Sequence, residues 1–303
     1  MSDLLSPALL RRLEQFQLLA ARQAKTAARG ERRSRARGQS VEFADFRSYV
    51  PGDDFRHLDW NLYGRLDRLF LKLYEEEREL PVRLFLDASE SMSFGAPPKF
   101  ELARQLAAAI GYVALCGFDR VSVTAFPAPP AGPGAAAETA ARAALRQVRG
   151  RGSSLAFFRN LATLQPRGAA SLNDALRRGA LEARQAGLAV VLSDFLDPAG
   201  YEAGLTALLG RGFEVTAVQI LAPEELNPTA FGDLRLVDAE TGQPQEVTFG
   251  RYRLKAYRRT VDNYVQRLRE FCSRRGIRFL SIPSDADLQA LLLRQLRAGA
   301  LWK

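Results

Sequence analysis

The sequence predicts an α/β protein whose central sheet is mainly parallel and flanked by helices. From residue 82 onward, short apolar runs typical of strands alternate with segments whose apolar residues recur at helical spacing. One of these runs, Leu188 to Leu192, is continuously apolar, as in a central strand that is buried on both faces. With 303 residues, of which 47% are apolar, the chain is long enough for one large core and a smaller accessory domain.

The individual elements follow from the period of the apolar residues. Strands are expected at 82–86, 121–126, 188–192, 213–221 and 277–282. Helices are expected at 102–113, 172–180 and 251–275, where apolar side chains share one helical face. A hairpin near 234–249, turning at Glu240-Thr241-Gly242, interrupts the alternation.

The chain divides into three predicted parts. Residues 1–38 form a basic helix (6–28) and an Arg-rich linker, and residues 39–80 form an accessory β element with a turn at Pro51-Gly52-Asp53. Residues 81–303 form the main domain, which contains the hairpin. Trp60, in the accessory element, is expected to be a core residue.

Positive charge is concentrated at the start of the chain. The net charge is +9, and residues 1–40 contain nine Arg or Lys against three acids. Such an arm can bind nucleic acid, an anionic membrane surface or an acidic protein, or it can be a solvated helix and linker. The segment from Arg29 to Arg37 has no aromatic residue on which bases could stack, which weakens the nucleic-acid interpretation without excluding it.

The cysteine count and the hydropathy favour a cytoplasmic protein. Cys116 and Cys272 are the only cysteines and are expected to be reduced packing residues. The first residues lack the pattern of a signal peptide, and no run approaches 18 consecutive apolar residues.

The main chemical feature is Asp87-Ala88-Ser89-Glu90-Ser91, directly after the strand at 82–86. A second carboxylate, Asp194, follows the strand at 188–192, and parallel neighbouring strands would bring it close to Asp87. Carboxylates and hydroxyls are the hard oxygen ligands that Mg²⁺ or Mn²⁺ prefers. The pattern therefore predicts a divalent cation site at Asp87, Ser89, Ser91 and Asp194.

These residues resemble the metal-ion-dependent adhesion site of von Willebrand factor type A domains. The preceding stretch is more specific, because its signature resembles that of the domain-of-unknown-function 58 family, with Met92 completing the match. The signature comprises Glu42-Phe43, Asp45-Phe46-Arg47-Ser48-Tyr49, Pro51-Gly52-Asp53-Asp54, Arg56, Leu58-Asp59-Trp60 and Arg65. The resemblance is clear over about residues 30–200 and looser in the C-terminal third.

The resemblance implies a von Willebrand factor A-like, Rossmann-like fold with an extra N-terminal β element. It also implies a bacterial, non-enzymatic adaptor that works with a MoxR-type AAA+ ATPase in chaperone-like remodelling of a client protein. The metal site would bind a carboxylate of the partner, and no small-molecule substrate is expected. Many relatives carry transmembrane helices before the signature, where this chain has the basic helix instead.

The chain departs from the family pattern in two places. The expected Gly-Gly-Thr-x-Leu is here Gly168-Ala169-Ala170-Ser171-Leu172, so Ala170 replaces the threonine ligand. Ser171 is either a fifth ligand or the start of a capping box with Asp174. The antiparallel edge strand usual after the strand at 121–126 has no β-rich counterpart, so it is shortened or replaced by an Ala-rich helix at 135–149.

Two other functions remain alternatives. Asp87 could be the nucleophile of a Mg²⁺-dependent phosphatase-like enzyme, although haloacid-dehalogenase-like enzymes need a second Asp where this chain has Ser89. No phosphate-binding Gly-x-x-x-x-Gly-Lys loop is present. The other alternative is nucleic-acid binding through residues 1–38.

Overall fold

The structure is a computed structural model that separates into two compact units, residues 21–79 and residues 1–20 with 80–303. The residues that it describes are 4–16, 41–51, 53–76, 79–128, 135–169, 171–228, 232–237 and 242–295. The predicted helix at 6–28 is described only up to residue 16, where α1 spans Pro7–Leu13. The Arg-rich linker, Ala170 and the turn residues Glu240 and Thr241 lie outside the described residues.

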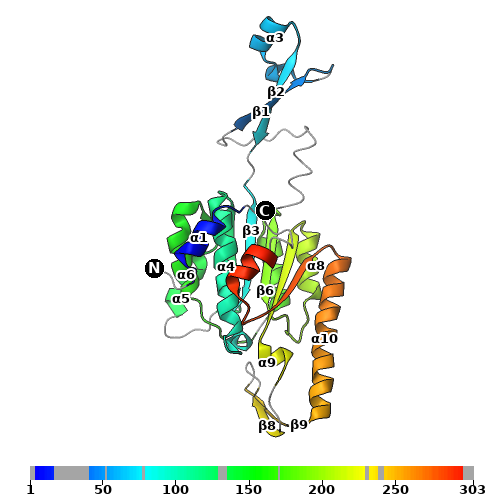
Figure 1. The fold of residues 1–303 in the computed structure, drawn as a ribbon. Coiled ribbons are helices and arrows are strands. Elements are labelled where there is room, and N and C mark those ends of the chain that lie inside the picture. The colour runs from blue at the N-terminus through cyan, green and yellow to red at the C-terminus, as the bar shows by residue number, and fades with distance from the viewer. Residues whose placement is uncertain are drawn as a thin grey trace. The chain divides into compact units, whose positions relative to one another are not determined.

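A six-stranded sheet forms the centre of the larger unit (Figure 1). Its strands, in spatial order, are β10 (Arg278–Pro283), β7 (Glu214–Leu221), β6 (Leu188–Ser193), β3 (Pro81–Asp87), β4 (Arg120–Phe126) and β5 (Val148–Arg149). All neighbouring pairs are parallel except β4 and β5. The predicted α/β class and mainly parallel sheet are therefore confirmed.

The strand β6 forms where the sequence is apolar enough to be buried on both faces. Every residue of β6 is buried, as the continuous apolar run predicts. The chain continues from β3 to β4 on one side and later places β6 on the other side. The order of the strands thus reverses at β3, and a crevice is expected beyond the carboxyl ends of β3 and β6.

Helices cover both faces of the sheet (Figure 1). The apolar cluster on one face includes residues of α1, α4 (Lys99–Cys116) and α6 (Ser154–Ala162). The cluster on the other face includes residues of α7 (Leu172–Glu182), α8 (Glu202–Gly210) and α10 (Arg251–Arg274). Alternate residues of β3 supply both clusters, with Leu84 and Leu86 on the first face and Phe85 on the second.

The edge of the sheet combines the two alternatives expected for the antiparallel edge strand, a shortened strand and an Ala-rich helix. Strand β5 has only two residues and pairs antiparallel with Arg120 and Val121. Helix α5 (Ala135–Ala144) precedes it in the Ala-rich segment. The edge strand is therefore shortened, and the helix occupies most of the expected range.

Beyond β7, the short helix α9 (Pro223–Leu226) precedes an antiparallel pair, β8 (Gly232–Val237) and β9 (Pro244–Phe249). The helix α10 follows directly. The chain then forms β10, α11 (Leu288–Ala290) and a final turn, Leu291–Gln295. Among the described helices, none is both long and apolar enough to cross a membrane.

The smaller unit contains two antiparallel strands, β1 (Val41–Ser48) and β2 (Phe70–Glu76), with the helix α3 (Trp60–Leu66) between them in the chain. Asp59 caps α3 by accepting the backbone N–H groups of Asn61 and Leu62. The expectation that Trp60 is a core residue is wrong. Its relative exposure is 64%, because it begins a helix that has no buried residue.

Close packing of α7 against β3 gives a testable prediction about stability. A Cβ at Gly179 of α7 would lie 2.4 Å from Cε1 of the buried Phe85 ring. Gly179→Ala is therefore expected to lower the free energy of unfolding by about 1–3 kcal/mol, measured by urea unfolding. At Gly210, which ends α8, nothing lies within 4 Å of such a Cβ, so Gly210→Ala is the matched control. Equal effects of the two substitutions would contradict the packing.

Candidate functional site

Asp87 ends β3, and both of its carboxylate oxygens are engaged. Oδ1 accepts hydrogen bonds from the backbone N–H of Ser89 at 3.0 Å and from Ser89 Oγ at 2.7 Å. Oδ2 accepts the hydroxyl of Ser193 at 2.6 Å. Only 1% of Asp87 is exposed, so its carboxyl group is held in one orientation at the end of the sheet.

Asp194 follows β6 and lies at the same edge. The parallel register aligns Leu86 with Leu192, so Asp87 lies beside Ser193. Asp194 is the next residue along the chain. Asp194 Oδ1 accepts the backbone N–H of Leu196 at 2.9 Å, whereas Oδ2 lies 3.4 Å from the Ser91 hydroxyl.

A hydroxyl pair joins the two carboxylates. Ser89 Oγ lies 3.0 Å from Ser91 Oγ, so Asp87, Ser89, Ser91 and Asp194 form one hydrogen-bonded chain. The structure thus brings together four of the five predicted ligands. They come from two loops, and Ser91 and Asp194 are 103 residues apart in the sequence.

Ser171 is the fifth predicted ligand and does not take part in this series of hydrogen bonds. Among the described residues, no hydrogen bond joins it to the other four. The loop before it is nevertheless close, because the backbone N–H of Glu90 bonds to Gly168 O at 2.8 Å and that of Arg167 bonds to Ala88 O at 2.7 Å.

The capping box at Ser171 is not formed. Ser171 occupies the N-cap position of α7, but its side chain makes no capping hydrogen bond. The carboxylate of Asp197, from the loop after β6, instead accepts the backbone N–H of Leu172 at 2.8 Å. A residue from another loop therefore supplies the cap, and the local sequence pattern could not show this.

Two charged residues that were not predicted from the sequence complete the site. Lys99 is the first residue of α4 and is 0% exposed. Its Nζ donates to Asp194 Oδ2 at 2.7 Å and to Glu225 Oε1 at 2.6 Å. Glu225 lies on α9, and its Oε2 accepts the backbone N–H of Ala222 at 2.8 Å. The one available signal was a lysine at the start of an apolar helix.

Burial dominates the electrostatics of the site. Desolvation, together with the nearby charge of Asp194, raises the pKa of Asp87 to about 7, despite the hydrogen bonds from Ser193 and Ser89 that lower it. For Lys99, burial alone would lower the pKa. The attraction of Asp194 and Glu225 outweighs it and raises the pKa, so the amine is an ammonium.

The donor set matches a hard divalent cation in the kind of atoms that it offers, although the Lys99 ammonium already contacts Asp194 Oδ2. Carboxylate and hydroxyl oxygens of Asp87, Ser89, Ser91 and Asp194 converge, as Mg²⁺ or Mn²⁺ requires. Within the described ranges, no three His, Cys, Asp or Glu side chains are grouped so as to hold a metal ion. Hydroxyls would therefore supply half of the four protein ligands.

A family model described as "Protein of unknown function DUF58" matches residues 45–270, which is most of the chain. The chain belongs to the DUF58 family. The resemblance predicted from the signature between Glu42 and Arg65 is thus confirmed, and the match extends into the C-terminal third.

Relatives of this DUF58 chain include uncharacterized proteins of Mycobacterium tuberculosis (Rv1480) and Mycobacterium bovis (Mb1516). Each is 30% identical over 276 residues, which is 87% of this chain and 82% of the relative. Among solved structures, the conserved hypothetical protein BatB from Bacteroides thetaiotaomicron is similar with a TM-score of 0.42 and 13% identity. An aerotolerance-related membrane protein from Bacteroides fragilis is similar with a TM-score of 0.43 and 14% identity. Each comparison covers 73% of this chain and 98% of the other.

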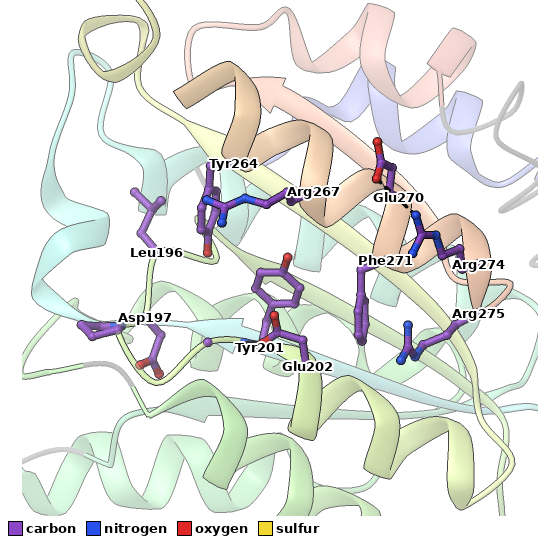
Figure 2. A pocket seen from close by; sticks show the side chains of 12 residues that line it. Leu196, Asp197, Tyr201, Glu202, Tyr264, Arg267, Glu270, Phe271, Arg274 and Arg275 are labelled. Atoms are coloured by element: carbon purple, nitrogen blue, oxygen red, sulfur yellow. Dashed lines mark hydrogen bonds and ion pairs between the residues drawn. The ribbon is translucent and has the colours of Figure 1, made fainter. Parts of the chain in front are cut away.

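A cavity of about 510 Å³ adjoins the loop that follows Asp194 in this DUF58 chain (Figure 2). Tyr201 lies between Tyr264 and Phe271, with ring centroids 6.2 and 5.5 Å away. The Tyr264 hydroxyl donates to the carbonyl of Phe195, the residue after Asp194. Helix α10 thus holds the loop that carries the second carboxylate.

The raised pKa of Asp87 predicts a pH-dependent stability. Between pH 4 and 7 the folded chain keeps a proton on Asp87 that the unfolded chain releases, so stability falls as pH rises through this range and levels off above it. Asp87→Asn cannot titrate, so its stability relative to the original chain should improve by on the order of 2–4 kcal/mol from pH 4 to 8. Urea unfolding in EDTA measures this difference, and a difference that does not change with pH would contradict it.

Proposed function

We propose that this DUF58 chain is a non-enzymatic protein-binding module with a von Willebrand factor A-like fold. In this proposal it is an adaptor for a MoxR-type AAA+ ATPase in chaperone-like remodelling of a client protein. Support for the fold comes from the parallel sheet with its short antiparallel edge strand, β5, and from the reversal of strand order at β3.

The observation that carries the proposal is the hydrogen-bonded chain of four oxygen-bearing side chains at the switch point of the sheet. Asp87, Ser89, Ser91 and Asp194 would hold Mg²⁺ or Mn²⁺, and the bound ion would supply a coordination position for a partner's Asp or Glu. The chain's own part is to orient these oxygens. Ser193 fixes Asp87 from one side, and the backbone N–H of Leu196 fixes Asp194.

The surroundings of Asp87 favour binding over catalysis. A phosphatase-like nucleophile needs a carboxylate oxygen that can reach its substrate. Both Asp87 oxygens accept hydrogen bonds, and the residue is 1% exposed. A phosphatase assay with Mg²⁺ and a generic phosphomonoester tests the enzymatic alternative, because turnover that is lost in Asp87→Asn would support it.

A pull-down of the cognate MoxR-type ATPase tests the binding proposal. The chain should retain the ATPase in Mg²⁺ and lose most of it in EDTA, and Asp87→Ala should abolish retention. Asp262→Ala, which removes an exposed carboxylate of α10, is the control and should bind normally. Retention that neither EDTA nor Asp87→Ala changes would overturn the metal-bridged proposal.

The same assay separates the basic arm from the site. The arm's linker lies outside the described residues, and its partner could be nucleic acid or an anionic membrane surface. Replacing the arginines between Arg29 and Arg37 by serine keeps the core residues of α1 and should leave retention of the ATPase intact. Salt-sensitive binding of DNA or RNA that disappears with these replacements but survives Asp87→Ala would instead assign the arm to nucleic acid.

A further inference from the structure

Lys99 is the only fully buried side chain with a positive charge among the described residues. A buried ammonium needs partners, and it has two, Asp194 Oδ2 at 2.7 Å and Glu225 Oε1 at 2.6 Å. The Lys99 ammonium thus lies at the place where the four predicted ligands would bind a metal cation. Lys99 and Asp194 therefore form a buried ion pair, since Asp194 is only 3% exposed.

The ammonium contacts the oxygen that a metal ion would need. Of the two Asp194 oxygens, Oδ1 is held by the backbone N–H of Leu196, and Oδ2 is the one near Ser91. Lys99 donates to that same Oδ2. A divalent ion bound there would be repelled by a unit charge at close range and would compete for one oxygen.

Close packing fixes the position of Lys99. The loop before α4 fits tightly against the loop after β7, since a Cβ at Gly95 would lie 2.8 Å from Ala222 Cβ. Ser284 Oγ also donates to Pro97 O at 2.8 Å. The backbone N–H of Ala222 holds the Glu225 carboxylate in place. The ammonium therefore keeps one carboxylate partner even when Asp194 binds another cation.

We propose that Lys99 is the internal counter-ion of the site and sets its metal affinity by competing with the divalent cation for Asp194. Metal alone is then bound weakly, and a partner's carboxylate, which adds a negative charge, favours the binding of both together. This inference rests on the proposed cation site. It assigns Lys99 the role of a competing cation and Glu225 that of its second carboxylate partner, and the ligand pattern includes neither.

Calorimetric titration of Mn²⁺ into the chain without any partner tests the inference. Lys99→Met should bind Mn²⁺ at least about tenfold more tightly than the original chain, because the competing charge is gone. Lys255→Met removes an exposed ammonium of α10 and should leave the affinity unchanged. Adding Asp87→Asn to Lys99→Met should remove the gain, which would locate the ion at this site.

The double variant Lys99→Met/Glu225→Gln removes one charge of each sign and keeps the test readable if the single variant does not fold. It should also gain affinity for Mn²⁺, whereas Glu225→Gln alone should not. Equal Mn²⁺ affinities of the original chain and the Lys99 variants, or a loss of affinity in those variants, would overturn the inference. Mn²⁺ binding by Lys99→Met combined with EDTA-insensitive retention of the ATPase would uphold it and reject the proposed function.

Discussion

Replacing Lys99 by methionine is expected to lower the free energy of unfolding by about 3–5 kcal/mol in EDTA. The substitution keeps most of the apolar volume but leaves Asp194 and Glu225 without the ammonium that both contact. Two buried carboxylates would then lack compensation. Urea unfolding at pH 8, where Asp87 is also ionised, measures the largest effect.

Two further variants isolate the cause of this loss. Lys255→Met should change stability by less than about 0.5 kcal/mol, because Lys255 is exposed. Adding Glu225→Gln to Lys99→Met should recover part of the loss, since one unpaired charge is removed. If the double variant is less stable than the single one, the two residues do not act as a charge pair. Saturating Mn²⁺ should stabilise Lys99→Met more than the original chain.

Ser193→Ala is the second substitution with a large expected effect on stability. Its hydroxyl donates to Asp87 Oδ2 at 2.6 Å and accepts the backbone N–H of Phe195 at 2.9 Å, and both bonds are buried. Each of the two groups left without a partner costs about 1–3 kcal/mol, so a total loss of about 2–6 kcal/mol is expected.

The loss in Ser193→Ala should grow with pH. The Ser193 hydrogen bond lowers the pKa of Asp87, so its removal raises that pKa above about 7 and extends the decline in stability to higher pH. Unfolding measured at pH 5 and pH 9 checks this, with Ser122→Ala in β4 as the control for a strand serine. A loss that is the same at both values would show that Asp87 is not the group concerned.

The elements that were predicted well are those in which local composition and tertiary burial agree. β6 is apolar at every buried position from Leu188 to Leu192, and α10 spans nearly the whole range expected for it. The nearness of Asp87 and Asp194 also followed from the sequence. Two parallel strands that end in carboxylates place these groups at one edge.

The remaining features depend on contacts that no local pattern encodes. Lys99 meets partners 95 and 126 residues further along the chain, and a lysine at the start of a helix is ordinarily solvated. The cap of α7 comes from Asp197, 25 residues beyond Leu172. In each case the partner lies in a segment that follows β6 or β7, so the position of that strand in the sheet brings the two groups together.

The central claim is that one cation joins the site to its proposed partner. The most direct test measures how the affinity of this chain for the proposed MoxR-type ATPase depends on the Mg²⁺ concentration. If one ion is taken up with each partner, the logarithm of the association constant should rise with the logarithm of free Mg²⁺ with a slope near one. Asp87→Asn should reduce the slope to near zero, and Asp262→Ala should not change it. An association constant of the original chain that does not vary from EDTA to saturating Mg²⁺ would contradict the account.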